Sequence, residues 1–353
     1  MNPQPQSIPQ PQSPARVQLR AADALIAVVP YLLGFHPEDS LVVIALSQPD
    51  GRVRLAFRFD LPDPPDRVIT AEIVRHAAVL LTRNQFADAV LIGYGPGTLV
   101  TPLADLARQV LPDAGIRLRD VLRVGDGRCW SYICTDPSCC PPDGLPAGSG
   151  THPAAAVLAG AGITAAPSRA ALAGNIAAIT GPDADAMIVA TAQAEQATLQ
   201  LAASGRRALL ADGLAAVKHA ITTYRADGTL RTADEFARLA LALTSLRVRD
   251  DAWARMDPVH RSGHRRLWTH VTRRARPGYV SAPASLLAFT AWQAGDGALA
   301  NLALDRALAD QPDYSMALLL RDALAACLPP AVARLPMTPE QVAACYDDLG
   351  RHH

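Results

Sequence analysis

This chain has a single lysine, no formal net charge and no apolar run long enough to cross a membrane. Lys218 is the one lysine, and the 33 Lys and Arg residues are balanced by 33 Asp and Glu residues. A chain without net charge has no overall field that attracts nucleic acid or an anionic membrane, so such binding would need a local patch. No signal-peptide pattern opens the chain. We therefore expect a soluble cytoplasmic protein without a membrane partner.

Signatures of the common phosphate-binding and hydrolytic sites are also lacking. The glycine-rich turn at residues 93–98 has neither dinucleotide-binding spacing nor a Gly-Lys-Ser/Thr triplet, and Pro96 removes one amide donor. No nucleophile elbow is present. We expect no cofactor, and a phosphate or nucleotide at this turn stays an alternative.

Six cysteines are present, and in a reducing compartment they are expected to stay free unless they bind metal or do redox chemistry. Four of them lie close together in the sequence, and their spacing is unusual for zinc. Structural zinc sites usually place ligand pairs two to four residues apart, and adjacent cysteines rarely hold one ion. We expect no metal site here. A thiolate metal site, a redox thiol and a docking loop are alternatives for Cys129, Cys134, Cys139 and Cys140.

The first 145 residues alternate between strand and helix patterns. Residues 1–14 are a Pro/Gln-rich tail that we expect to be disordered. Asp-Gly and Gly-Asp-Gly turns predict two hairpins. The order predicts a three-layer α/β domain with a mixed sheet over residues 15–145. Its predicted strands lie near 15–20, 41–46, 53–59, 87–93, 116–124 and 128–133, and its predicted helices near 21–33, 66–83 and 102–111.

Polar side chains are densest at residues 36–40, between a predicted helix and a predicted strand. Helical crossovers make strands 53–59 and 87–93 parallel, and the first hairpin reverses strand 41–46. The start of strand 41–46 should then lie beside the carboxyl ends of its neighbours, where open α/β sheets usually bind ligands. The candidate pocket comprises His36, Glu38, Asp39, Ser40, Asp60, Gly93, Gly95 and Thr98.

Two interpretations of this pocket remain open. It can bind a small molecule or carry acid–base or hydrolytic chemistry, or Asp39 and Ser40 can simply bond the backbone of their own loop. By the same strand polarity, the cysteine loop should leave from the opposite edge of the sheet, so His36 should not share a metal ion with it.

Residues 146–151 are rich in Pro, Gly and Ser, which predicts a linker before an all-α domain at 152–350. Residues 283–327 resemble a tetratricopeptide-like helical hairpin, because small side chains at Ala288, Ala300 and Ala307 let two helices approach closely. We expect this hairpin to stack on the preceding helices. The predicted helices lie at 152–161, 168–179, 183–203, 206–224, 232–249, 264–275, 284–294, 298–310, 313–327 and 338–349.

The strongest charge patch lies at residues 260–276. On a helical wheel, one face gathers Arg266, His270, Arg273 and Arg274, which suits phosphate contact. Such a face more often pairs with carboxylates, for which Asp250, Asp251 and Asp257 are candidates. We expect no nucleic-acid partner and keep nucleic-acid binding as an alternative.

Three peptides carry a resemblance: LLGFHPEDSLVV, VLIGYGP and RCWSYICTDPSCCPPDG. Together they resemble the actinobacterial family catalogued as domain of unknown function 4192. The resemblance implies an actinobacterial source and cytoplasmic residence, and it assigns no activity. Whether the chain is an enzyme stays open. We expect a non-catalytic binding or adaptor protein whose helical domain contacts a protein partner, in an oligomeric state that the sequence leaves open.

Overall fold

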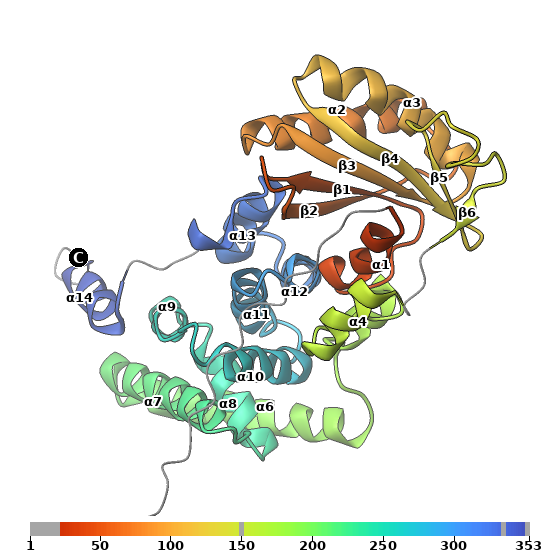
Figure 1. Ribbon diagram of the computed structural model, residues 1–353. Helices are drawn as coiled ribbons and strands as arrows, with labels where there is room; N and C mark the ends of the chain where they lie inside the picture. Colours follow the sequence, from red (N-terminus) through yellow and green to blue (C-terminus); the bar gives the residue numbers. More distant parts are fainter. Residues whose placement is uncertain (1–21, 148–151, 333–336, 350–353) are drawn as a thin grey trace, which may run out of the picture.

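The computed structural model describes residues 22–147, 152–332 and 337–349. A mixed six-stranded sheet with its helices occupies the first part, and a helix-rich part follows (Figure 1). This is the fold class that the sequence predicted. The expected tail at 1–14 and the expected strand at 15–20 lie outside the described residues.

The sheet has the strand order β2-β1-β3-β4-β5-β6. β1 is antiparallel to both β2 and β3, β3 is parallel to β4, and β5 and β6 are added antiparallel. These polarities confirm the predicted arrangement, including the two hairpins. The strands are β1 (Ser40–Leu46), β2 (Val53–Asp60), β3 (Asp88–Tyr94), β4 (Arg117–Gly125), β5 (Arg128–Ser131) and β6 (Leu145–Pro146).

Helices cover both faces of the sheet and make three layers (Figure 1). On one face lie α2 (Arg67–Arg83) and α3 (Gly97–Asp113), which bury alternate strand residues such as Leu41, Val43 and Leu91. On the other face lies α1 (Ala22–Leu33), which ends at Gly34 with a φ of 78°. β1 is buried nearly throughout, as its apolar run predicted.

One continuous apolar cluster joins the second face of the sheet to the helix-rich part. It contains Val42 and Ile92 of the sheet together with Trp268 and Phe289 of the helices. Close to this junction, the backbone N–H of His36 donates to the carbonyl of Ala166 at 3.0 Å. The two parts therefore share one apolar cluster. Their division into two domains with a linker at 146–151 stays a prediction.

The helix-rich part follows the predicted segments with one break. The predicted helix at 232–249 is two helices, because Ser245 takes an extended backbone and begins the second of them. The predicted capping box of Thr232 and Glu235 is present. The helices are α4 (Pro153–Gly160), α5 (Arg169–Gly174), α6 (Pro182–Ala203), α7 (Arg206–Arg225), α8 (Ala233–Ala242), α9 (Leu246–Ala254), α10 (Arg261–Arg274), α11 (Ser281–Gln293), α12 (Gly297–Asp310), α13 (Ser315–Ala325), the 3₁₀ turn η1 (Pro330–Val332) and α14 (Pro339–Leu349).

α11 is the central helix of this part. It is buried from Ser281 to Trp292 and packs against α10 and α12. α11 and α12 form the expected helical hairpin, and its likeness to a tetratricopeptide unit stays a prediction. Among the described helices, none combines the length and the apolar character needed to span a membrane.

Candidate functional site

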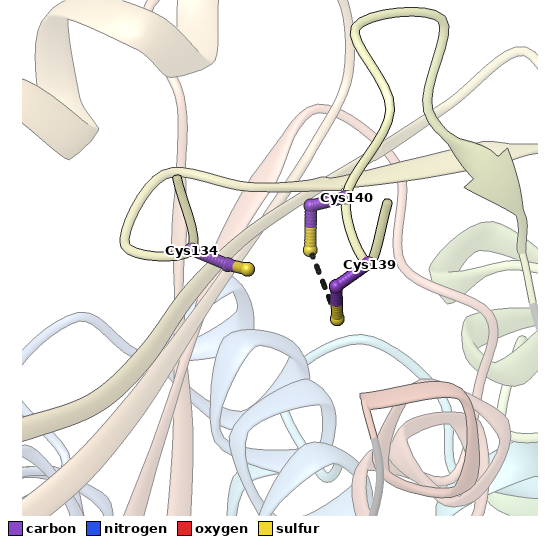
Figure 2. Close-up of side chains that lie close together, drawn as sticks. All are labelled: Cys134, Cys139 and Cys140. Atoms are coloured by element: carbon purple, nitrogen blue, oxygen red, sulfur yellow. Dashed lines mark hydrogen bonds between the residues drawn. The ribbon is translucent and has the colours of Figure 1, made fainter. Parts of the chain in front are cut away.

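Three cysteine side chains converge in the loop that follows β5. We call residues 132–144 the thiol loop. The Sγ atoms of Cys134, Cys139 and Cys140 all lie within 4.8 Å of one another, and those of Cys139 and Cys140 are 3.9 Å apart (Figure 2). In a tetrahedral zinc site with Zn–S bonds of about 2.3 Å, neighbouring sulfur atoms are about 3.8 Å apart. The three thiols are therefore close to the spacing of metal ligands.

Hydrogen bonds inside the loop set this convergence. The Ser131 hydroxyl accepts from the backbone N–H of Cys134 at 3.1 Å and donates to Asp120 of β4 at 2.7 Å. The carbonyl of Asp136 accepts from the N–H groups of Cys139 at 3.1 Å and Cys140 at 2.7 Å. This tight turn folds the last two cysteines back toward the first.

The base of the loop is fixed to β4 and β5. The indole N–H of Trp130 donates to the carbonyl of Pro142 at 3.0 Å, and Arg128 donates to the carbonyl of Gly144 at 2.8 Å. Gly144 has a φ of 74°, and a Cβ there would lie 2.6 Å from the Trp130 ring. Only glycine suits this close approach to the indole.

The pKa values of two of these thiols, Cys134 and Cys140, are shifted in opposite directions. A backbone hydrogen bond from Asp136, followed by bonds from the other two thiols, lowers the pKa of Cys134. The same contact with the Cys134 sulfur, together with burial, raises the pKa of Cys140 to about 12. Of these two thiols, Cys134 therefore has the lower pKa.

Cys129 does not join these three residues. It is buried in the apolar cluster beneath the sheet, and burial raises the pKa of its thiol. The number of residues between the cysteines argued against a metal site, but that number does not fix the distance between their sulfur atoms in the folded loop. The Asp136 turn reverses the chain and brings together three of the four residues that we had considered.

The cluster leaves room for an outside ligand. Among the described residues, no further His, Cys, Asp or Glu belongs to the group. Cys139 is exposed, while Cys134 and Cys140 are half-buried. Three protein ligands beside solvent correspond to a zinc site with an open fourth position, whereas structural zinc sites have four protein ligands.

A family model described as "Domain of unknown function (DUF4192)" matches residues 23–331. The chain belongs to this family. Among curated proteins and solved structures, none matches the chain. The DUF4192 match includes the whole thiol loop and both faces of the sheet, and it ends before α14. The family description names no activity, so function has to be argued from the site.

The DUF4192 sheet also brings together most of the candidate pocket. Ser40 of β1 pairs with Asp60 of β2 and with Tyr94 of β3. A Cβ on Gly95 would lie 3.0 Å from Oδ1 of Asp39. The loop at 36–40 therefore lies at the edge where β2 and β3 end, as strand polarity predicted. Of the remaining candidates, Gly93 is buried at the end of β3, whereas His36, Glu38 and Thr98 are exposed.

Arg58 is the residue of this edge that the sequence did not reveal. Its Nε donates to the Ser40 hydroxyl at 2.7 Å, and its guanidinium contacts the Asp60 carboxylate. The Ser40 hydroxyl is fully buried and also donates to the carbonyl of Glu38. The alternation of arginines along β2 was the available signal. The candidate pocket stays a prediction.

Two surface cavities are described elsewhere in the DUF4192 chain. One of about 320 Å³ lies between α7 and α8 and includes His219 and Glu235. The other, of about 580 Å³, lies beside β4 and includes Arg108 and Ile133. Neither is lined by a residue of the candidate pocket.

β5 leads into the thiol loop and runs toward the opposite edge of the DUF4192 sheet, and after the loop β6 returns to pair with the start of β5. β5 begins opposite Gly125 and ends with Ser131 opposite Leu122, so it runs away from the edge that holds residues 36–40. Figure 2 shows the cysteine side chains, and His36 is not a member of the group. That His36 and these cysteines share no metal ion stays a prediction.

The basic face of α10 is occupied by contacts within the DUF4192 chain. Arg266 lies 3.3 Å from Asp227, and Arg273 donates to the carbonyl of Ala177 at 3.3 Å. The remaining two positions are engaged as well: Arg274 stacks 4.6 Å from the Phe236 ring, and His270 bonds to the Tyr224 hydroxyl at 2.7 Å. Burial, followed by Arg274 and the other nearby arginines, lowers the pKa of His270.

Two of the carboxylates that we expected beside this face, Asp250 and Asp251, bind arginines of α9 and its C-cap. Asp257 binds Arg225 at 2.6 Å and also lies 2.9 Å from His260 and 3.4 Å from His264 at the start of α10. The side chains that offset the face come instead from the loop after α7 and from α8. The absence of a nucleic-acid partner stays a prediction, and nucleic-acid binding at this face stays the alternative.

Proposed function

We propose that this protein binds a thiophilic metal ion at the thiol loop and acts as a binding protein rather than as a catalyst. The supporting observation is the convergence of three thiols, Cys134, Cys139 and Cys140, to within 4.8 Å. Thiolates favour soft or borderline ions, above all Zn²⁺ and Cu(I). Zn²⁺ fits best, because Cys139 is exposed and a water molecule on that side can bind the ion as its fourth, tetrahedral ligand.

Packing alone does not account for these cysteines. Free cysteine is among the most buried residue types and usually serves as a small apolar side chain. Cys129 follows this rule, but Cys139 is exposed and its sulfur faces a second sulfur at 3.9 Å. Three thiols gathered at a solvent boundary are better explained by a ligand that they hold in common.

Zinc titration of the full chain tests this proposal. Reduced, metal-free protein competes with a chromophoric chelator for Zn²⁺, and we expect one equivalent to bind. C134S, C139S and C140S should each weaken binding by more than about tenfold. C345S is the matched control, because Cys345 is an exposed cysteine of α14 outside the cluster. Zinc affinity that is equal in all four variants would refute the site.

A second candidate function is supported by one helix face. α6 exposes Ile188, Val189 and Leu199, which are 47%, 57% and 72% exposed, while Met187 and Ala190 are buried against the protein. The helix has acidic residues in its first turn and no Lys or Arg from residue 182 to residue 203. We propose that this face binds an amphipathic helix with basic flanks, which keeps the adaptor role as a proposal.

Variants that place charge on α6 test this second proposal. A partner recovered with the wild-type chain should be lost with V189E and L199E. L319E is the control, because Leu319 is also 70% exposed but lies on α13. A synthetic peptide that contains only the basic amphipathic helix of the recovered partner should then bind the wild-type chain. A partner retained by V189E and L199E would show that α6 is not the surface.

A further inference from the structure

We infer that the thiol loop is a metal-exchange site, from which an acceptor ligand removes the bound ion by entering its open fourth position. This inference rests on the proposed metal binding and adds what the site does with the ion. The acceptor class is a soft donor such as a thiolate. No electron is transferred: a first acceptor donor would replace the water in the fourth position, further acceptor donors would then replace the three cysteine sulfurs one by one, and the released thiolates would take protons from solvent.

The first support is the incomplete ligand set. Three cysteines belong to the cluster, and no fourth His, Cys, Asp or Glu among the described residues completes it. Cys139 is exposed, so one side of the cluster faces solvent. An entering ligand therefore needs no prior loss of a protein ligand, which is the step that slows release from a closed four-ligand site.

The second support is that hydrogen bonds within the protein fix the backbone of the loop. The Trp130 indole donates to the Pro142 carbonyl at 3.0 Å. The Ser131 hydroxyl accepts from the N–H of Cys134 at 3.1 Å, and the Asp136 carbonyl accepts from the N–H of Cys140 at 2.7 Å. A structural zinc site, by contrast, supplies the folding energy of the segment that carries it. Here the backbone is held by hydrogen bonds to other protein groups, so we expect that an ion can leave without unfolding the loop.

The third support is the short span of the ligands. Cys134, Cys139 and Cys140 lie within seven residues of one another in the sequence. Structural zinc sites usually tie two ligand pairs from separate segments. Closing a loop of five or six residues removes less chain entropy than tying distant segments. The site is thus better suited to holding an ion than to stabilising the fold.

Stopped-flow transfer of Zn²⁺ to 4-(2-pyridylazo)resorcinol tests the exchange mechanism on the full-length protein. We expect the transfer rate to rise in proportion to chelator concentration, and to rise further when reduced glutathione is added. C345S should behave as the wild type does. A rate that is independent of both chelator and glutathione would show that the ion must dissociate first, and it would overturn the inference.

Hydrogen exchange of the metal-free protein supplies a second test. The N–H groups of Cys134 and Cys140 bond to the Ser131 hydroxyl and the Asp136 carbonyl, so on this inference peptides covering 130–144 should exchange slowly in the apo state. Immediate exchange that becomes slow only with Zn²⁺ would indicate a structural site and overturn the inference. If no Zn²⁺ binds at all, the proposed function itself fails, so the two failures are distinguishable.

Discussion

The guanidinium of Arg123 stacks on Trp130, with its central carbon 3.5 Å from the ring centroid. This pair ties the thiol loop to β4, because the same indole donates its N–H to the carbonyl of Pro142. Cation–π contacts of this kind contribute about 0.5–1 kcal/mol at exposed sites. The placement of the thiols therefore depends on residues that cannot themselves bind the ion.

Replacing Trp130 should weaken metal binding without removing any ligand. W130A removes both the stack and the hydrogen bond to Pro142, and we expect zinc affinity to fall roughly tenfold, as for other residues that orient ligands. W130F keeps an aromatic ring and should lose less affinity. Competition titration with a chelator measures both variants. Unchanged affinity in W130A would show that the stack does not position the thiols.

Gly144 and Gly127 form a matched pair for testing the close approach of the loop to the indole. Their φ angles are 74° and 71°, but a Cβ would clash with Trp130 only at Gly144, since Gly127 has nothing within 4 Å. G127A should cost about 1 kcal/mol of unfolding free energy from backbone strain alone. G144A should cost about 1–3 kcal/mol more. Urea unfolding compares them, and equal losses would contradict the clash.

Asp257 should make the unfolding free energy depend on pH. Burial on its own raises the pKa of Asp257, but hydrogen bonds from the backbone and ring of His260 and from His264, together with Arg225, lower it to about 2. A carboxylate with a lowered pKa stabilises the fold above its unfolded pKa near 3.8, and that contribution is lost as pH falls toward 2.

We therefore expect D257N to be less stable than the wild type by roughly 1–2 kcal/mol at pH 6, with a gap that narrows between pH 4 and pH 2.5. Urea unfolding at a series of pH values measures this gap. D105N is the control, because the Asp105 carboxylate is 58% exposed in its pair with Arg108. A gap of constant size across the pH series would show that Asp257 is not responsible.

The α10 arginines should contribute to stability rather than to nucleic-acid binding. We expect the R266A/R273A/R274A variant to elute from heparin at the same salt concentration as the wild type, because these guanidiniums already contact Asp227, Ala177 and Phe236. The variant should instead melt at a lower temperature. R261A alters an exposed arginine of α10 and is the control. Earlier elution of the triple variant alone would favour a nucleic-acid site.

The sequence predicted the sheet because its signals are local. The Asp-Gly turn ending at Gly51, which has a φ of 63°, and the turn at Asp126 and Gly127 reverse the chain over a few residues. The crossover helices fix the remaining polarities. These directions predicted that residues 36–40, Asp60 and residues 93–98 share one edge of the sheet, and the structure added the pairing of Ser40 with Asp60 and with Tyr94.

Contacts between distant residues decided the rest. The basic face of α10 was visible on a helical wheel, but its partners at Asp227 and Phe236 come from the end of α7 and from α8. Arg58 likewise became part of the sheet edge only through its bond to Ser40, eighteen residues away. Helical and strand periodicity reports which residues are buried, and it does not report which polar groups meet.

The sequence by itself determined the fold class and the relative directions of the strands, which place residues 36–40 beside the ends of β2 and β3. Only the tertiary structure decided that Cys134, Cys139 and Cys140 converge and that Cys129 does not. The physical reason is that the distance between thiols in a short loop depends on how the loop folds. That fold is fixed by hydrogen bonds to Asp120 and from Trp130, which linear spacing does not contain.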